Sequence, residues 1–240
     1  MKVSFFSTCL ADVVFPGIAV NSLKLLERLG CQVIYNPKQT CCGQPLANSG
    51  YQEKAKKSMR LIIDSLLENP ADYIVAPSGS CVLQVQEYPK IFEHEPGFSQ
   101  KAKNLAAKTK ELTDFIVNVL GVDKVESRLH GRAVYHPSCH MTRRLGVRTP
   151  PLTLLSNVTG LNLVPFKGQD KCCGFGGTFS VKMADLSGAM VAEKVENIIA
   201  SGARYLIGSD AGCLMNIGGR LQKMAHRMEV LHIAEVLMRQ

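Results

Sequence analysis

The sequence predicts an α/β protein built as two tandem, duplicated three-layer domains, each with a Rossmann-like parallel sheet. Strand-like and helical segments alternate along the chain, and the second half repeats the cysteine pattern of the first. The chain has 240 residues, of which 46% are hydrophobic and 20% charged, so it is long and apolar enough to bury a sizeable core. We expect its functional sites at the carboxyl ends of the strands.

An internal repeat accounts for eight of the nine cysteines. The offsets between the halves are 130, 131, 131 and 132 residues for the pairs Cys9 and Cys139, Cys41 and Cys172, Cys42 and Cys173, and Cys81 and Cys213. The flanking phrases agree, since VSFFSTC matches AVYHPSC and DYIVAPSGSC matches RYLIGSDAGC. The repeat predicts two domains, residues 1–125 and 126–240, joined near 121–131.

Apolar runs and amphipathic segments alternate in the first half. Short β-leaning runs predict strands, and apolar stripes at helical spacing predict helices, at 2–6, 18–30, 31–36, 53–69 and 72–77 in chain order. A further helix is predicted over 99–121, because apolar residues fall on one face there, namely Leu105, Leu112, Ile116 and Val119. The alternating order favours a parallel sheet covered by helices.

Every repeated cysteine follows a strand-like segment. In a parallel sheet the loops after the strands emerge at one carboxyl edge, so cysteines distant in sequence should converge there. The two sets of candidate cofactor and metal ligands are Cys9, Cys41, Cys42 and Cys81, and Cys139, Cys172, Cys173 and Cys213.

Four converging thiolates satisfy one iron–sulfur cluster or one tetrahedral zinc ion. The ligands lie about thirty to forty residues apart, unlike the short knuckles of common zinc modules. An adjacent cysteine pair suits a cluster because its side chains reach different irons, and Gly43 or Gly174 lets the loop turn tightly. We expect an iron–sulfur cluster of the 4Fe–4S type in one or both halves, with zinc in one half as an alternative.

Composition argues against several classes of function. The net charge of +8 comes from 28 basic and 20 acidic residues, but the basic residues are dispersed and there is no Trp, so nucleic-acid binding is not expected. No run approaches the roughly 18 apolar residues of a membrane span. The N-terminus lacks a signal-peptide cleavage site, so we expect a cytoplasmic protein, whose cysteines do not form structural disulfides. Cys31 lies outside the repeat and is expected to be buried and inert.

Several phrases carry a family resemblance over essentially the whole chain. They are CCGQP, NSGY, PSGSC, YHPSCH, CCGFGGTFSVKMA, LIGSD, GCLMNIGGRL and HIAEVL. The duplicated CCG pattern resembles the cysteine-rich CCG domains of heterodisulfide reductase B subunits and of glycolate oxidase iron–sulfur subunits. With the other phrases, the chain resembles the lactate utilisation protein A (LutA/YkgE) family.

The resemblance implies an iron–sulfur subunit of an oxidoreductase, an L-lactate dehydrogenase complex that oxidises lactate to pyruvate. Electron transfer would run through cysteine-bound clusters, beside LutB-like and LutC-like protein partners. Two alternatives stay open from the residues themselves: a zinc-stabilised, non-enzymatic scaffold, and a thiol–disulfide reductase that uses the CC pairs.

One departure from the heterodisulfide reductase relatives concerns a fifth cysteine. In those relatives each unit ends in C-x-x-C, whereas this chain has Ser78 and Asp210 in place of the first cysteine of that pair. Four ligands in each half favour a simpler cluster than the relatives' five-thiolate one, with Ser78 or Asp210 near an iron.

Polar residues near Cys139 are candidates for catalysis. His136 and His140 flank this cysteine, and Arg143 follows with a guanidinium that can clamp a carboxylate. The two histidines are candidates for proton transfer, hydroxy-acid recognition or hydrogen bonding to a cluster, with an ordinary loop position as the alternative. Arg143 is a candidate for carboxylate binding, with contact to a partner or solvent as the alternative. These extra residues make the second half the chemically richer one.

Overall fold

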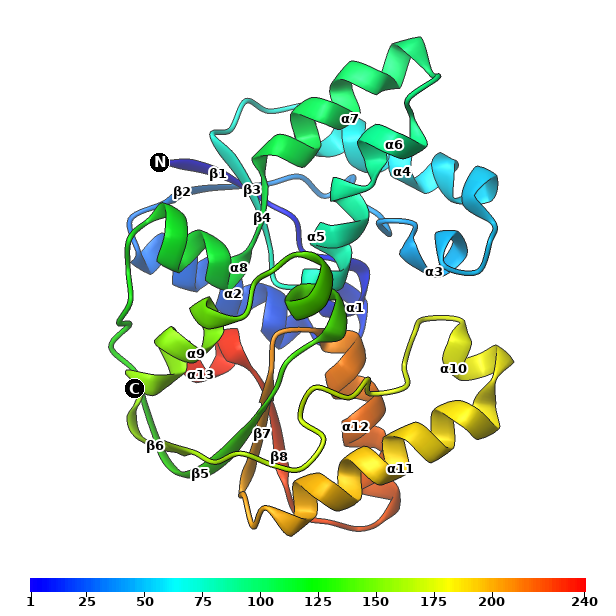
Figure 1. Cartoon of the computed structure of the whole chain (residues 1–240). Helices are drawn as coiled ribbons and strands as arrows, with labels where there is room; N and C mark the ends of the chain where they lie inside the picture. Colours follow the sequence, from blue (N-terminus) through cyan, green and yellow to red (C-terminus); the bar gives the residue numbers. More distant parts are fainter. The chain divides into compact units, whose positions relative to one another are not determined.

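The computed structural model describes all residues from Met1 to Gln240 and divides into two compact units, Met1–Phe115 and Ile116–Gln240 (Figure 1). The predicted join at 121–131 contains a segment without regular secondary structure, which ends where β5 begins at Arg128. Every helix falls short of the length and apolarity that a membrane span requires.

The first unit contains one four-stranded parallel sheet in the order β2-β1-β3-β4. Its strands are β1 (Lys2–Phe5), β2 (Gln32–Tyr35), β3 (Tyr73–Ala76) and β4 (Thr109–Glu111). Val3 of the central β1 pairs with Val33 on one side and Tyr73 on the other. The parallel pairing brings the carboxyl ends of all four strands to one edge.

Helices cover both faces of the first sheet. They are α1 (Cys9–Val13), α2 (Pro16–Arg28), α3 (Gln44–Ala47), α4 (Gln52–Leu67), α5 (Gly79–Gln86), α6 (Tyr88–Ile91), α7 (Pro96–Lys108) and α8 (Leu112–Asp114), followed by a π-helical turn (Phe115–Val119). Helix α2 packs on β2, while α7 contacts α4, α5 and β3 (Figure 1). Right-handed crossovers explain why helices lie on both faces. The chain moves from β1 to β2 toward one edge of the sheet and then from β2 to β3 toward the other edge.

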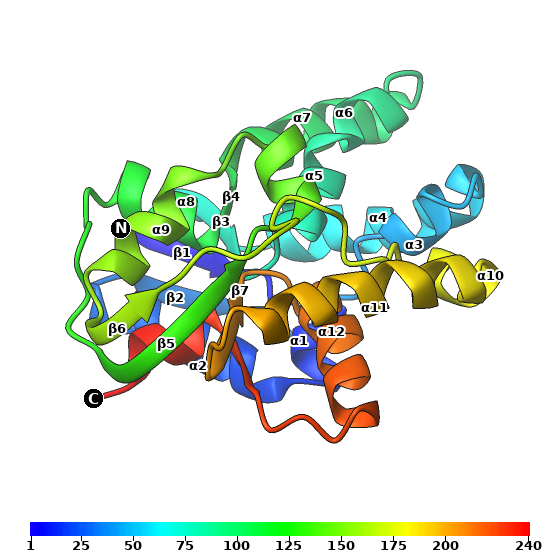
Figure 2. The ribbon, with the colours of Figure 1, turned by 60° about the horizontal axis from the view of Figure 1, so that its bottom comes forward.

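The second unit repeats this topology with strand order β6-β5-β7-β8, all parallel. Its strands are β5 (Arg128–His136), β6 (Thr159–Leu163), β7 (Tyr205–Gly208) and β8 (Glu229–His232). Its helices are a π-helical turn (His140–Arg144), α9 (Thr149–Ser156), α10 (Phe179–Lys182), α11 (Ala184–Ala200), α12 (Ala211–Lys223) and α13 (Ile233–Met238). Helices α11 and α12 pack together, as do α9 and α13 (Figure 2). The predicted fold class is confirmed.

The helix predicted over 99–121 is wrong, because a strand interrupts it. Helix α7 ends at Lys108, and Thr109–Glu111 form β4 on the open edge of β3. Pairing with β4 satisfies the backbone N–H and C=O groups on the outer side of β3, which would lack hydrogen-bond partners if residues 109–111 were helical. The buried Glu111 then caps α8, accepting hydrogen bonds from the amides of Thr113 at 2.8 Å and Asp114 at 3.1 Å.

The hydrophobic core of the second unit reaches the carboxyl edge of its sheet. In the second unit Val134, Leu206 and Val195 belong to one buried cluster that also includes Cys173 and Cys213. Two thiols of the repeat are thus part of the core as well as candidates for chemistry.

Candidate metal sites

The structure places all eight repeated cysteines at the carboxyl ends of strands. In the first unit Cys9 begins α1 after β1, the adjacent pair lies in the loop after β2, and Cys81 is the third residue of α5 after β3. In the second unit Cys139 follows β5, the pair follows β6, and Cys213 is the third residue of α12 after β7. Each unit therefore collects four thiols at one edge of its sheet.

The thiols of the first unit form a chain of hydrogen bonds that runs Cys9, Cys41, Cys42, Cys81. The thiols of Cys42 and Cys9 donate to the Cys41 sulfur, which lowers the pKa of Cys41 to about 3. The same bonds, together with burial, raise the pKa values of Cys9 and Cys42.

The second unit has the same chain, which runs Cys139, Cys172, Cys173, Cys213. Hydrogen bonds from Cys139 and Cys173 lower the pKa of Cys172 to about 2, and they raise the pKa values of both donors. The exposure pattern also repeats. In each unit the cysteine after the first strand and the first cysteine of the pair are half-buried, and the other two are buried. Both units thus present the same four-thiol arrangement.

Glycines shape both loops that carry the cysteine pairs. Gly43 and Gly174 have φ values of +83° and +85°, a conformation that L side chains rarely adopt. The amide of Gly174 points at the Cys172 sulfur, 3.4 Å away, and the Gly43 amide also lowers the pKa of Cys41. Backbone donors near the sulfurs stabilise their negative charge.

Side chains fix the second cysteine of each pair from outside the loop. The hydroxyl of Tyr88 donates to the carbonyl oxygen of Cys42 at 2.8 Å, and Asn216 Nδ2 donates to that of Cys173 at 2.8 Å. Tyr88 is fully buried, and Asn216 lies on α12. The backbone around the buried thiol is thereby held before any metal binds. Neither residue is predicted from the sequence, because a single Tyr or Asn in a helix carries no motif.

Ser78 and Asp210 are the N-caps of α5 and α12, with nearly equal backbone angles (φ −154° and −144°, ψ 112° in both). The Ser78 hydroxyl accepts from the Cys81 amide at 3.4 Å, and Asp210 Oδ1 accepts from the Gly212 amide at 3.3 Å. These residues therefore start the helices that carry the last thiols. Capping gives a physical reason for their residue types, independent of any iron.

His136 distinguishes the second site from the first. It is the last residue of β5, it is 1% exposed, and the repeat aligns it with Phe6. One ring nitrogen and the sulfurs of Cys173 and Cys213 all lie within 4.8 Å of one another. Neither ring nitrogen has a hydrogen-bond partner. Burial, helped by the charge of Lys194, lowers the pKa of His136 to about 3, so the imidazole is neutral.

Lys194 is a second difference between the two sites. This α11 residue is 3% exposed, and its Nζ donates to the carbonyl oxygens of Gly168 at 2.8 Å and Gln169 at 3.0 Å. Burial lowers its pKa, while the nearby thiols of the second site act in the opposite direction. The repeat aligns Lys194 with the buried Ile63 of α4. The second site therefore holds a buried cation that the first one lacks.

Lys194 belongs to no motif, but the sequence contains a signal for it. Lys194 lies on the same helical stripe as Val191, Val195 and Ile198, which face the core. A lysine in such a stripe is exceptional, because burying an ammonium is costly without partners.

His140 and Arg143 lie on the π-helical turn that follows Cys139. The exposed Arg143 donates from Nη2 to the carbonyl oxygen of Asp170, which joins this turn to the loop before Cys172. Its positive charge also acts against the raised pKa of Cys139. His140 is half-buried. The candidate residues from the sequence are thus all next to the second thiol set.

Cys31 lies apart from both thiol sets. It directly precedes β2, at the amino edge of the first sheet, and is 7% exposed. Burial raises its pKa. This placement agrees with the expected inert role and makes Cys31 a useful control.

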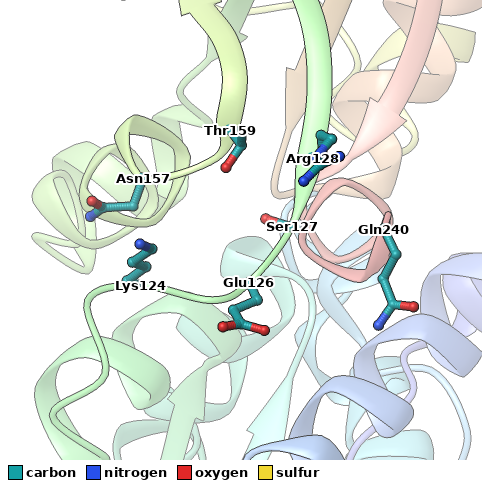
Figure 3. A pocket seen from close by; sticks show the side chains of 7 residues that line it. All are labelled: Lys124, Glu126, Ser127, Arg128, Asn157, Thr159 and Gln240. Atoms are coloured by element: carbon teal, nitrogen blue, oxygen red, sulfur yellow. The ribbon is translucent and has the colours of Figure 1, made fainter.

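A pocket of about 490 Å³ lies at the amino ends of β5 and β6 (Figure 3). It is lined by Lys124, Glu126, Ser127, Arg128, Asn157, Thr159 and Gln240. Because this is the opposite end of the strands from the thiols, the pocket is not part of the metal site.

Two parallel α/β units, each with four clustered thiols at the carboxyl edge, define a duplicated cysteine-rich protein whose thiols suggest metal or iron–sulfur binding. The family model described as the CCG cysteine-rich domain matches residues 3–86 and 133–218. Lactate utilization protein A of Bacillus subtilis (strain 168) is 54% identical over 237 residues, covering 99% of each chain. YkgE of Escherichia coli (strain K12) is 52% identical over 238 residues, also covering 99% of each. The chain belongs to the CCG cysteine-rich domain family and, within it, to the lactate utilisation protein A (YkgE) family.

A solved structure shows the same fold at low sequence identity. The crystal structure of a hypothetical protein from Helicobacter pylori aligns with a TM-score of 0.66 and 10% identity over 99% of this chain. The chain spans about half of that structure, 48% of its length.

Proposed function

We propose that this protein is a cytoplasmic iron–sulfur subunit of a system that oxidises L-lactate to pyruvate, and that it transfers electrons through cysteine-bound clusters. The observation that carries the proposal is the duplicated four-thiol chain at the carboxyl edge of each sheet. The printed name of the full-length relatives, Lactate utilization protein A, supports the metabolic setting. LutB-like and LutC-like proteins are the proposed partners.

The thiols present fit a four-cysteine cluster in each unit. One would be held by Cys9, Cys41, Cys42 and Cys81, and the other by Cys139, Cys172, Cys173 and Cys213. Such a cluster supplies one-electron transfer when bound. Hydrogen bonds from the neighbouring thiols favour the thiolate form of Cys41 and of Cys172, and thiolate is the form that binds a metal.

Each site has one side that is shielded from solvent and one that is partly exposed to it. The second cysteine of each pair and the cysteine on the following helix are buried, while the other two are half-buried. The buried side excludes water from the sulfurs, and the half-buried side lets electrons reach a docked partner. The glycine amides and, in the second unit, Lys194 offset negative charge at the sulfurs.

We assign recognition of the lactate carboxylate to His140 and Arg143. They follow Cys139 on one turn, and Arg143 uses one guanidinium nitrogen to hold the Asp170 carbonyl oxygen. A guanidinium has five N–H donors, so Arg143 retains donors for a bidentate carboxylate contact.

Anaerobic purification followed by iron, acid-labile sulfide and zinc analysis with EPR tests the proposal. We expect about four irons with matching sulfide for each loaded site. The variants Cys41→Ser and Cys172→Ser should each lose the content of one site, whereas Cys31→Ser should lose none. Colourless protein with stoichiometric zinc and no sulfide would instead favour the zinc-stabilised scaffold.

Zinc in the second unit alone is a second candidate that one observation favours. His136, Cys173 and Cys213 form a compact nitrogen and sulfur donor set, which structural zinc accepts. Zinc retained after Cys41→Ser but lost after Cys173→Ser, with iron behaving in the opposite way, would identify this mixed protein.

A further inference from the structure

We propose that His136 is a metal ligand of the second site, which makes the two sites chemically different. This inference rests on the proposed function only in requiring that the second thiol set binds a metal, whether iron in a cluster or zinc. The supporting observation is a distance: a ring nitrogen of His136 and the sulfurs of Cys173 and Cys213 all lie within 4.8 Å of one another.

The unpaired ring of His136 is the first argument for ligation. The side chain is 1% exposed, and both Nδ1 and Nε2 lack hydrogen-bond partners. Buried polar groups are nearly always paired, and an unpaired one loses its hydration without compensation. A metal bound through one nitrogen removes part of this deficit, because neutral imidazole is a common metal ligand.

The compact donor set is the second argument. One ring nitrogen of His136 and the sulfurs of Cys173 and Cys213 all lie within 4.8 Å of one another, on three separate segments of the chain. Imidazole nitrogen and cysteine sulfur are both ligands that zinc and iron accept.

Comparison of the two units is the third argument. Phe6 of the first unit is 0% exposed at the position that aligns with His136, so an apolar ring fits this place in the fold. The histidine is thus not needed for packing. Its polar ring occurs only beside the second thiol set, next to the two buried sulfurs.

A nitrogen ligand has a direct consequence for the redox potential. Imidazole is neutral where a thiolate carries a negative charge, and a cluster in which histidine takes the place of a cysteine ligand has a higher potential than one held by cysteines alone. His136 would have this effect by taking the place of one of the four thiols as a ligand. If the second site holds a cluster, its potential should exceed that of the first, and Lys194 acts in the same direction.

X-ray absorption at the edge of the bound metal tests the proposal on the full chain. In the wild-type protein we expect one nitrogen among the ligands of the second site, and we expect its loss in His136→Phe. His130→Phe is the matched control, since His130 lies on the same strand but is exposed and toward its amino end. Pulsed EPR of reduced, ¹⁵N-histidine-labelled protein gives an independent signature when the metal is iron.

The Cys41→Ser, Cys42→Ser double variant isolates the second site. The first unit contains a single histidine, His94, so wild-type protein serves as the sample if this variant does not fold. Only-sulfur coordination of the metal, or a nitrogen signal that persists in His136→Phe, would overturn the proposal. Zinc without sulfide would refute the cluster function, yet leave the ligand assignment to be decided by the same nitrogen signal.

Discussion

Gly174 packs so tightly against Ser187 that a Cβ at Gly174 would lie 2.9 Å from the Ser187 carbonyl oxygen. The two residues are also hydrogen-bonded, since Ser187 Oγ donates to the Gly174 carbonyl oxygen at 2.8 Å. This contact fixes the loop of the second cysteine pair against α11. The corresponding Gly43 meets the end of a flexible side chain instead, Met59 Cε at 2.9 Å.

We predict that Gly174→Ala destabilises the protein more than Gly43→Ala. Both changes force a side chain into a left-handed conformation, which costs about 1–2 kcal/mol. Only at Gly174 is the close atom part of the backbone and unable to move aside. Urea unfolding under anaerobic conditions and metal content per site measure the difference. Equal losses for the two variants would show that the Ser187 contact does not constrain the loop.

Lys194→Ile should lower the redox potential of the second site. The buried ammonium favours the more negative, reduced state, and Ile63 shows that isoleucine fits the aligned position. A tenfold change in the one-electron equilibrium corresponds to about 59 mV, so we expect a shift on the order of 50 mV. EPR-monitored redox titration measures it. Lys223→Ile, at the exposed end of α12, is the charge control and should leave the potential unchanged.

Glu111 should make the first unit less stable as the pH rises through neutrality. Burial raises the pKa of this carboxyl to about 7, above the ordinary 4.5, and its Oε1 has no hydrogen-bond partner. The folded state therefore holds a proton that the unfolded state has lost, so stability falls between about pH 4.5 and 7. Glu111→Gln keeps an acceptor for the α8 amides and should be more stable than wild type at pH 8, by roughly 1–3 kcal/mol.

Anaerobic urea unfolding from about pH 4.5 to 8 compares Glu111→Gln with Glu27→Gln, which removes an exposed carboxylate on α2. The wild type and the Glu27 variant should lose stability across this range more steeply than the Glu111 variant. Parallel pH profiles for all three would contradict a buried, protonated Glu111.

Arg143→Ala should raise the KM for lactate of the assembled system while both sites keep their metal. Loss of a charged hydrogen bond costs about 1.5–3 kcal/mol, equivalent to roughly 10- to 150-fold. Arg148→Ala is the control, because Arg148 contacts the same residue through Asp170 Oδ1 at 3.3 Å without following Cys139 directly. An unchanged KM, or loss of metal in Arg143→Ala, would reduce Arg143 to a tether for the loop.

The sequence was sufficient for the repeat, the parallel sheets and the position of the eight thiols, because strand order alone brings those loops to one edge. It failed at β4, where Thr109–Glu111 lack an apolar strand pattern and pair only because β3 leaves an open edge. The proximity of His136 to two sulfurs could not be predicted from the sequence, because His136 and Cys213 are distant in the chain. The burial of Lys194 could be predicted from its place in an apolar helical stripe, but its hydrogen bonds to the carbonyl oxygens of Gly168 and Gln169 could not.

Native mass spectrometry of the anaerobically purified chain tests the central claim most directly, namely that each unit holds its own cysteine-bound cluster. The account predicts a mass increase of two iron–sulfur clusters in the wild type. Cys41→Ser and Cys172→Ser should each retain one cluster, and the double variant none. If the wild type instead carries the mass of one cluster, and Cys41→Ser and Cys172→Ser each lose it, the two thiol sets form one shared site. A mass increase of two zinc ions would show that neither unit holds a cluster.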